Sequence, residues 1–178
     1  MKTITSKSGK KITFRPPRKT DLEALYQYAK SLEAEDTFVL LNPSEPVNYQ
    51  EEKNYLTSLL KDIQAKKKIH ALVVDNHKIV GASHIEKKGR RQGHVGLFGI
   101  ALLQAYRSGG IGRQLADYVI NLAKTQLQLT QIILDCLASN TIAIKFYKSL
   151  GFTQYGRQPK AMLYKNQYVD KILFYKHL

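Results

Sequence analysis

The chain has 178 residues, of which 43% are hydrophobic and 24% charged, and this composition excludes a disordered chain and predicts one globular domain over residues 1–178. Its 28 Lys and Arg residues against 14 Asp and Glu residues give a net charge of +14, which favours polyanions. The single cysteine, Cys136, excludes an intrachain disulfide, and no apolar run approaches the ~18 residues of a membrane span, so we expect a cytoplasmic protein without membrane contact.

The first third of the chain predicts one short strand and two helices. Residues 1–10 are polar and suggest a loosely held start. Residues 11–15 alternate apolar and polar side chains, which is typical of a strand, and apolar residues at helical spacing predict helices over about 20–32 and 48–67. The connection over residues 33–46 holds two prolines and several acidic residues, and a long loop of this kind often carries function.

The middle of the chain predicts a hairpin followed by a further strand. Residues 69–75 and 78–86 are rich in β-branched side chains and are separated by a turn of two residues. The next expected strand runs from His94 to Leu103 and contains Gly96 and Gly99. Because glycine inside a strand marks a bulge or a close backbone approach, we expect this fourth strand to be locally distorted.

The stretch from Ile100 to Leu115 carries the strongest functional signal. It leaves the fourth strand, passes through a turn containing Gly110 and Gly112, and enters an amphipathic helix. The first turn of a helix has unpaired N–H groups and a positive dipole end, and glycine lets this backbone approach a ligand closely. The sequence therefore predicts a phosphate site at this turn.

The last third of the chain predicts a fifth strand over 131–137 and a shorter helix. Ser139 or Asn140 is the expected N-cap of that helix, and Gly151 follows its end. Residues 152–155 and 171–175 are further strand candidates. The element order predicts an α+β fold, in which a mixed, mostly antiparallel sheet is flanked by about four helices. The histidines and the cysteine show no metal-ligand spacing, so no metal is expected.

Two segments together resemble the GCN5-related N-acetyltransferase (GNAT) superfamily. Arg107, Gly110 and Gly112 match the pattern Arg-x-x-Gly-x-Gly between the fourth strand and the third helix. The segment 140–152 is similar to the pattern Asn-x-x-Ala-x-x-x-Tyr-x-x-x-Gly-Phe, in register at Asn140, Ala143, Tyr147, Gly151 and Phe152. The resemblance covers about residues 69–155, and residues 168–176 resemble the last strand of one branch of the family.

The resemblance implies a cosubstrate, acetyl-CoA, bound where the fourth and fifth strands splay apart. Its pantetheine arm would pair with the fourth strand, and its pyrophosphate would lie on the N–H groups of the glycine turn. The residues that the resemblance implies for CoA binding are Ile100, Ala101, Leu102, Arg107, Ser108, Gly109, Gly110, Ile111, Gly112, Asn140 and Tyr147. A homodimer is expected only at the level of the family.

The resemblance also implies direct attack of a primary amine on the thioester, without an acyl-enzyme. Tyr147 would protonate the leaving thiolate, and a backbone N–H of the fourth strand would stabilise the oxyanion. Many family members carry the general base on that strand, whereas this chain has Gly96, Leu97 and Phe98 there. His94 is one candidate for the base. The acidic residues of the long connection are the others, namely Glu33, Glu35 and Asp36.

Alternative interpretations remain at this point. A dinucleotide-binding unit is disfavoured, because Leu115 stands at its third glycine position and the preceding strands are expected to be linked by hairpins. A catalytically impaired protein of the same fold would bind acyl-CoA, RNA or a ribosome without turnover. A soluble basic surface without a dedicated partner explains the net charge more simply, since the lysines are spread along the chain. The sequence does not distinguish between an acceptor amine on a small molecule, on a protein N-terminus and on a lysine side chain.

Overall fold

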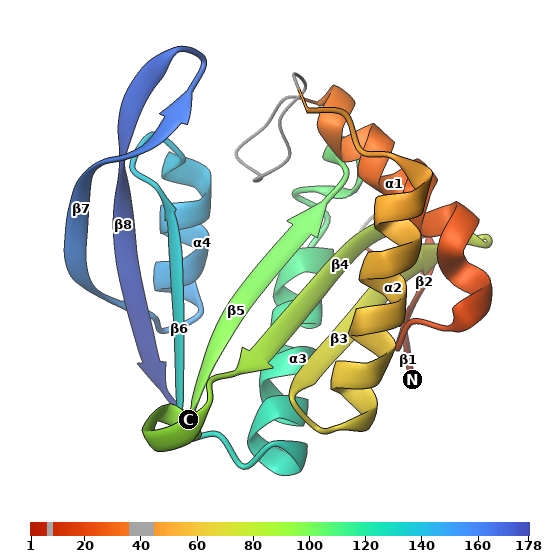
Figure 1. Ribbon diagram of the computed structural model, residues 1–178, viewed down its shortest axis with the longest axis horizontal. Coiled ribbons are helices and arrows are strands. Elements are labelled where there is room, and N and C mark those ends of the chain that lie inside the picture. The colour runs from red at the N-terminus through yellow and green to blue at the C-terminus, as the bar shows by residue number, and fades with distance from the viewer. Residues whose placement is uncertain (7–8, 36–44) are drawn as a thin grey trace.

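The computed structural model describes residues 1–6, 9–35 and 45–178. Within these ranges the chain forms one eight-stranded sheet and four α-helices (Figure 1). The strands are β1 (Lys2–Thr5), β2 (Lys11–Arg15), β3 (Lys68–Asp75), β4 (Lys78–Lys87), β5 (Val95–Leu102), β6 (Gln131–Leu137), β7 (Thr153–Tyr164) and β8 (Gln167–His177). The helices are α1 (Leu22–Ala34), α2 (Tyr49–Gln64), α3 (Ile111–Gln126) and α4 (Thr141–Ser149).

The expected loose start of the chain is wrong in part, because residues 2–5 form the edge strand β1. It pairs antiparallel with β2, and Ile4 is its one buried side chain. A strand of four residues with one apolar side chain shows almost no alternation, which is why the sequence gives little sign of it. The fourth and fifth expected strands are therefore β5 and β6.

The sheet has the order β1-β2-β3-β4-β5-β6-β8-β7, and β5 and β6 form its parallel pair. That pairing extends only from Val95↔Gln131 to Leu97↔Ile133. Beyond Leu97, the described part of the chain offers β5 a partner strand on the β4 side alone. The two ribbons diverge from this point, as Figure 1 shows, and the expected splay of these strands is confirmed.

Helices cover both faces of the sheet. α1 and α2 pack on the face where Leu72 of β3 lies, and α3 and α4 pack on the face where Ile132 of β6 lies (Figure 1). The side chains at both centres are almost fully buried. Among the described helices, none is both long and apolar enough to cross a membrane.

The expected distortion of β5 is also wrong on its β4 side, where the register is continuous from Gly96 to Leu102. The two glycines instead permit close approach. A Cβ on Gly96 would lie 2.5 Å from a methyl of Ile85, and a Cβ on Gly99 would lie 2.5 Å from Cε1 of His84. The sequence signal had two meanings, and packing against β4 was the correct one.

Candidate active site

The glycine turn before α3 presents a run of unpaired backbone donors. Gly110 is the N-cap of α3 and has a φ of +79°, a left-handed conformation that glycine adopts without strain. From Ser108 to Arg113, no N–H group donates to another group in the described part of the chain. The Arg107 N–H is different, because it donates to the Gln104 carbonyl at 3.1 Å. A helix dipole and adjacent unpaired donors make this turn an anion site.

The side chain of Arg107 is bound within the protein. Its Nε donates to the Leu102 carbonyl at 2.8 Å, and its Nη2 donates to a carboxylate oxygen of Glu35. The second carboxylate oxygen of Glu35 accepts the Gln104 N–H at 2.7 Å. Arg107 therefore links the glycine turn to the residue that caps α1 at its C-terminal end, and its guanidinium is committed to that role.

The acidic candidates for a general base are engaged elsewhere or lie outside the described residues. Glu35 holds Arg107, as just described. The carboxylate of Glu33 accepts the Val47 N–H at 3.1 Å, which ties the end of α1 to the segment before α2. Asp36 lies outside the described residues.

The backbone of β5 alternates between its neighbour β4 and the splay. The Leu103 N–H donates to the Val80 carbonyl at 2.9 Å, and this register directs the polar backbone groups of Ala101 and Gly99 toward β4 as well. The groups of Ile100 and Leu102 therefore face the splay. The Leu102 carbonyl accepts from Arg107. What remains is an edge made by both groups of Ile100 and the N–H of Leu102.

Ala101 differs from its two neighbours. Its carbonyl accepts a hydrogen bond from the Tyr28 hydroxyl of α1 at 3.1 Å, so its backbone faces away from the splay. Of the three residues that the resemblance implied for the pantetheine arm, Ile100 and Leu102 have the suitable orientation.

Helix α4 supplies the opposite wall. The Asn140 Oδ1 accepts the Ala143 N–H at 3.0 Å, so Asn140 caps the helix and keeps its amide N–H groups for another partner. The buried Tyr147 ring stands edge-on to Phe98 of β5, with ring centroids 6.3 Å apart and an interplanar angle of 87°. Burial raises the pKa of the Tyr147 phenol, and the neighbouring Cys136 and Asp135 raise it further. The phenol is therefore protonated at neutral pH.

His94 lies apart from this constellation. It is exposed on the turn before β5, and its carbonyl accepts the N–H groups of Thr130 and Gln131 at 3.0 and 3.2 Å. This is the end at which β5 and β6 are still paired, whereas Tyr147 packs against Phe98, beyond the pairing. Tyr147 packs against β5 beside the splay, Ile100 lies on its edge, and the glycine turn follows the end of β5, whereas His94 lies at the paired end.

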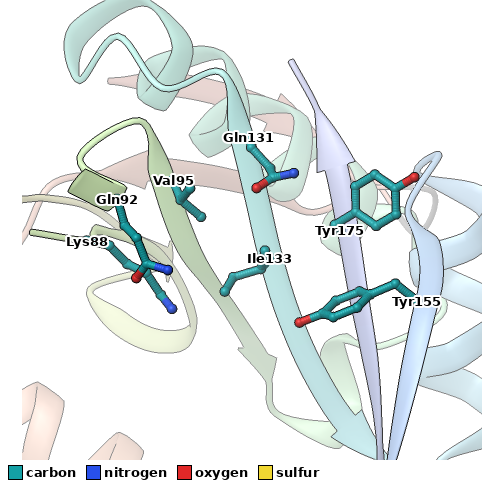
Figure 2. Close-up of a pocket in the computed structure, with 7 residues that line it drawn as sticks. All are labelled: Lys88, Gln92, Val95, Gln131, Ile133, Tyr155 and Tyr175. Carbon is teal, nitrogen blue, oxygen red and sulfur yellow. The ribbon is translucent and has the colours of Figure 1, made fainter.

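A shallow pocket of about 410 Å³ adjoins the paired end of β5 and β6 (Figure 2). Its lining residues come from the β4–β5 turn and four strands, namely Lys88, Gln92, Val95, Gln131, Ile133, Tyr155 and Tyr175. Figure 2 shows the two tyrosines on one side of the pocket and Lys88 with Gln92 on the other. Ile133 was visible in the sequence only as part of an apolar run.

A metal centre has no counterpart in this region. Within the described ranges, no group of three or more His, Cys, Asp or Glu side chains is arranged to hold a metal ion.

The acetyltransferase (GNAT) family model matches residues 34–152, which is more than half of the chain. The protein therefore belongs to the GNAT family of acetyltransferases. A comparison with curated proteins found no match.

Solved structures with the same fold span nearly the whole chain. A GNAT-family acetyltransferase from Streptococcus pneumoniae is 22% identical with a TM-score of 0.83, over 94% of this chain and 99% of that one. The ribosomal-protein-S5-alanine acetyltransferase from Vibrio fischeri is 21% identical with a TM-score of 0.83, over 93% and 92%. A putative acetyltransferase from Salmonella typhimurium, solved with acetyl-CoA, is 18% identical with a TM-score of 0.79, over 94% of each chain.

Proposed function

We propose that this protein transfers the acetyl group of acetyl-CoA to a primary amine by direct attack within a ternary complex. One observation carries the proposal. The unpaired edge of β5 at Ile100 and Leu102 leads directly into the unpaired N–H groups of Ser108 to Arg113. An extended chain of amides that ends in a pyrophosphate is complementary to that sequence of donors and acceptors.

The residues around the splay divide the binding of acetyl-CoA among themselves. The pantetheine amides would pair with the backbone of Ile100 and Leu102, as a neighbouring strand would. The pyrophosphate would accept hydrogen bonds from the turn around Gly110, where the dipole of α3 adds positive potential. The side-chain amide of Asn140 can donate to the arm from the opposite wall, because its oxygen is already used for capping.

The chemical step needs a polarised carbonyl and a protonated leaving group. As the amine nitrogen bonds to the acetyl carbon, the N–H of Ile100 would stabilise the oxyanion. The carbon–sulfur bond then breaks, and Tyr147 would give its proton to the thiolate. Burial keeps this phenol protonated at neutral pH, so Tyr147 carries a proton when the thiolate leaves.

The pocket beside Tyr155 and Ile133 lies at the paired end of β5 and β6 and is large enough for a small molecule or the first residues of a peptide. Several solved structures of this fold are described as ribosomal-protein acetyltransferases, and they support a protein N-terminus as one candidate acceptor.

The direct test is release of free thiol from acetyl-CoA over a panel of amines, amino acids, peptides with free N-termini and lysine peptides. Binding of CoA is measured in parallel by calorimetry. Thiol release that depends on one class of amine supports the proposal. CoA binding without thiol release for any acceptor contradicts turnover.

A second candidate, a protein that binds acyl-CoA or RNA without turnover, is favoured by one observation. Gly96, Leu97 and Phe98 give β5 no side chain that can accept a proton. Binding of RNA through phosphate contacts would weaken steeply with salt, which fluorescence anisotropy at 50 and 200 mM salt measures.

A further inference from the structure

A histidine of β4 lies directly against the strand that borders the splay. His84 pairs with Gly99 across β4 and β5, two strands that lie side by side in Figure 1. A Cβ on Gly99 would lie 2.5 Å from Cε1 and 2.9 Å from Nε2 of His84. The imidazole therefore covers the Cα of Gly99, and only glycine leaves room for it at this position.

The position of this contact along β5 matters. Gly99 comes two residues after the last β5–β6 pair, at Leu97, and directly before Ile100, whose N–H faces the splay. The His84 ring thus lies one residue from the backbone that would hold the acetyl carbonyl. It lies on the sheet face that α1 and α2 cover, since Ala82, two residues away, packs in their cluster.

Tyr147 approaches β5 from the other face. It contacts Phe98, whose side chain belongs to the core beneath α3 and α4. A base and an acid on opposite faces of the strand suit this reaction, because the amine and the thiolate exchange protons at different atoms. The sheet also keeps the two groups from exchanging a proton directly.

The protonation state of His84 fits a proton acceptor. Its half-buried ring stacks on His70 of β3, with ring centroids 5.8 Å apart and an interplanar angle of 13°. Burial and then Lys68 lower the pKa of His84 to about 4, while Glu86 opposes that shift. The ring is therefore neutral at pH 7. Within the described part of the chain, no hydrogen bond occupies either of its nitrogens, so a lone pair is available.

The other titratable groups on this face are engaged or farther from the splay. Glu86 pairs with Leu97, at the paired end of β5 and β6, and its carboxylate is ion-paired with Lys68 at 2.8 Å. Lys68 also lowers the pKa of Glu86, so the carboxylate stays in this ion pair. From α2, Tyr55 carries a phenol whose pKa burial raises to about 12, with Glu52 and Glu86 adding to the shift, so it remains protonated.

We propose that His84 accepts the proton of the attacking amine, in place of the side chain that β5 lacks. This inference rests on the proposed acetyl transfer. The amine nitrogen bonds to the acetyl carbon and its proton passes to an imidazole nitrogen of His84. The carbon–sulfur bond breaks and the thiolate takes the proton of Tyr147. Solvent then removes the proton from His84 and restores one to Tyr147, so no proton is gained or lost by the protein.

The central test compares His84→Gln with His77→Asn, which alters an exposed histidine on the turn of the same hairpin. We expect His84→Gln to lower kcat by about 10²-fold or more, with the KM for acetyl-CoA changed by less than about twofold. The acidic limb of the pH profile of kcat/KM should disappear in that variant. His77→Asn should match the wild type. Wild-type kcat in His84→Gln overturns the inference, as does a larger loss in His94→Gln or Glu86→Gln.

A second variant reaches the same ring without changing it. In Gly99→Ala the added Cβ must displace the imidazole of His84, so kcat should fall while calorimetry still detects CoA binding. A fully active Gly99→Ala protein contradicts the placement of the ring. This variant also guards against a folding defect in His84→Gln.

A measurement without turnover separates this inference from the proposed function. The protein is labelled with ¹⁵N-histidine, and the imidazole signals are followed as acetyl-CoA is added. We expect the His84 signals to shift and those of His77 to stay. If CoA does not bind, the proposed function and this inference both fail. If CoA binds and the His84 signals do not move, only the assignment of His84 fails.

Discussion

Glu35 is the C-cap residue of α1, and its carboxylate holds the guanidinium of Arg107 at the start of the glycine turn. Glu35 also accepts the Gln104 N–H, so one side chain fixes two points of the turn. In Glu35→Gln we expect a roughly fivefold higher Kd for CoA, which corresponds to about 1 kcal/mol for this partly exposed ion pair. Calorimetry measures it, with the exposed Glu23→Gln of α1 as control. An unchanged Kd would show that the turn keeps its shape without this contact.

The Tyr147 hydroxyl is expected to act in catalysis and not in binding. Tyr147→Phe keeps the edge-on ring contact with Phe98 and removes only the proton donor. We expect kcat to fall by about 10²-fold while the Kd for CoA stays within about twofold. Steady-state kinetics and calorimetry on the same preparation check this. Tyr118→Phe on α3 is the matched control, and equal turnover in both variants would remove Tyr147 from the mechanism.

The left-handed conformation of Gly110 makes the turn sensitive to any side chain. In Gly110→Ala the φ of +79° costs about 1–2 kcal/mol for an L-residue. The turn relieves this strain by moving its N–H groups, so CoA affinity should fall by about tenfold. Gly89→Ala, at an exposed glycine with nothing near the added Cβ, should bind CoA as the wild type does. Tight CoA binding by Gly110→Ala would disprove the anion site at this turn.

The ion pair between Arg15 and Asp21 is expected to stabilise the N-terminal part of the fold. Two Arg15 nitrogens donate to the carboxylate at 2.7 Å each, and the Arg18 N–H donates to it as well. Burial raises the pKa of Asp21, but these hydrogen bonds outweigh it and leave the pKa below its usual range. Their stabilisation is present above the unfolded pKa of about 3.9 and is lost as the pH falls through the lower folded value.

Urea unfolding at pH 7 tests this contact. Asp21→Asn should lower the free energy of unfolding by about 2 kcal/mol, because hydrogen bonds to a charged and buried carboxylate are lost. Asp117→Asn, an exposed aspartate on α3, should change it by less than about 0.5 kcal/mol. Equal midpoints for the two variants would contradict the assigned role of Asp21.

The stacked pair of His70 and His84 is expected to make the fold sensitive to mild acid. Burial is the main cause that lowers both pKa values below 6.5, and among the residues that the structure describes neither ring nitrogen of His70 finds a hydrogen-bond partner. The unfolded chain therefore binds protons first as the pH falls below about 6.5, and stability declines from there toward the folded pKa values. Urea midpoints at pH 7.5 and pH 5 should differ less in His70→Leu than in the wild type. The same difference in both proteins would argue against this linkage.

The local elements and the anion turn were predictable because their signals lie within a few residues. The cap at Asn140, the Gly110 turn and the helix that follows it are determined by neighbours in the sequence. The splay came from the resemblance, and the β5–β6 register confirms it. Contacts between strands could not be predicted from the sequence. Gly99 was noted as an unusual residue inside a strand, but glycine is needed there because the β4–β5 register places a side chain of β4 against it.

The same limit explains the failure of the sequence to place a base. Along β5 the sequence offers Gly96, Leu97 and Phe98, none of which accepts a proton, and His94 is near them only in sequence. The residue proposed as the base lies on the neighbouring strand β4, which the order of residues along the chain does not reveal. Alternation would have placed His84 on the same face as Ala82, but no pattern states which residue of β5 it meets.

Three residue pairs join β5 to β6, and they lie at one end of these strands. The sheet thus has two parts, β1 to β5 and β6 to β8, which are joined through these pairs at one end only. A molecule that bonds to β5 and also to α4 would fasten the open edge. The protein with a bound ligand should then unfold in one sharper transition at a higher temperature. A melting curve would therefore report the fraction of protein that carries a bound ligand in a given preparation.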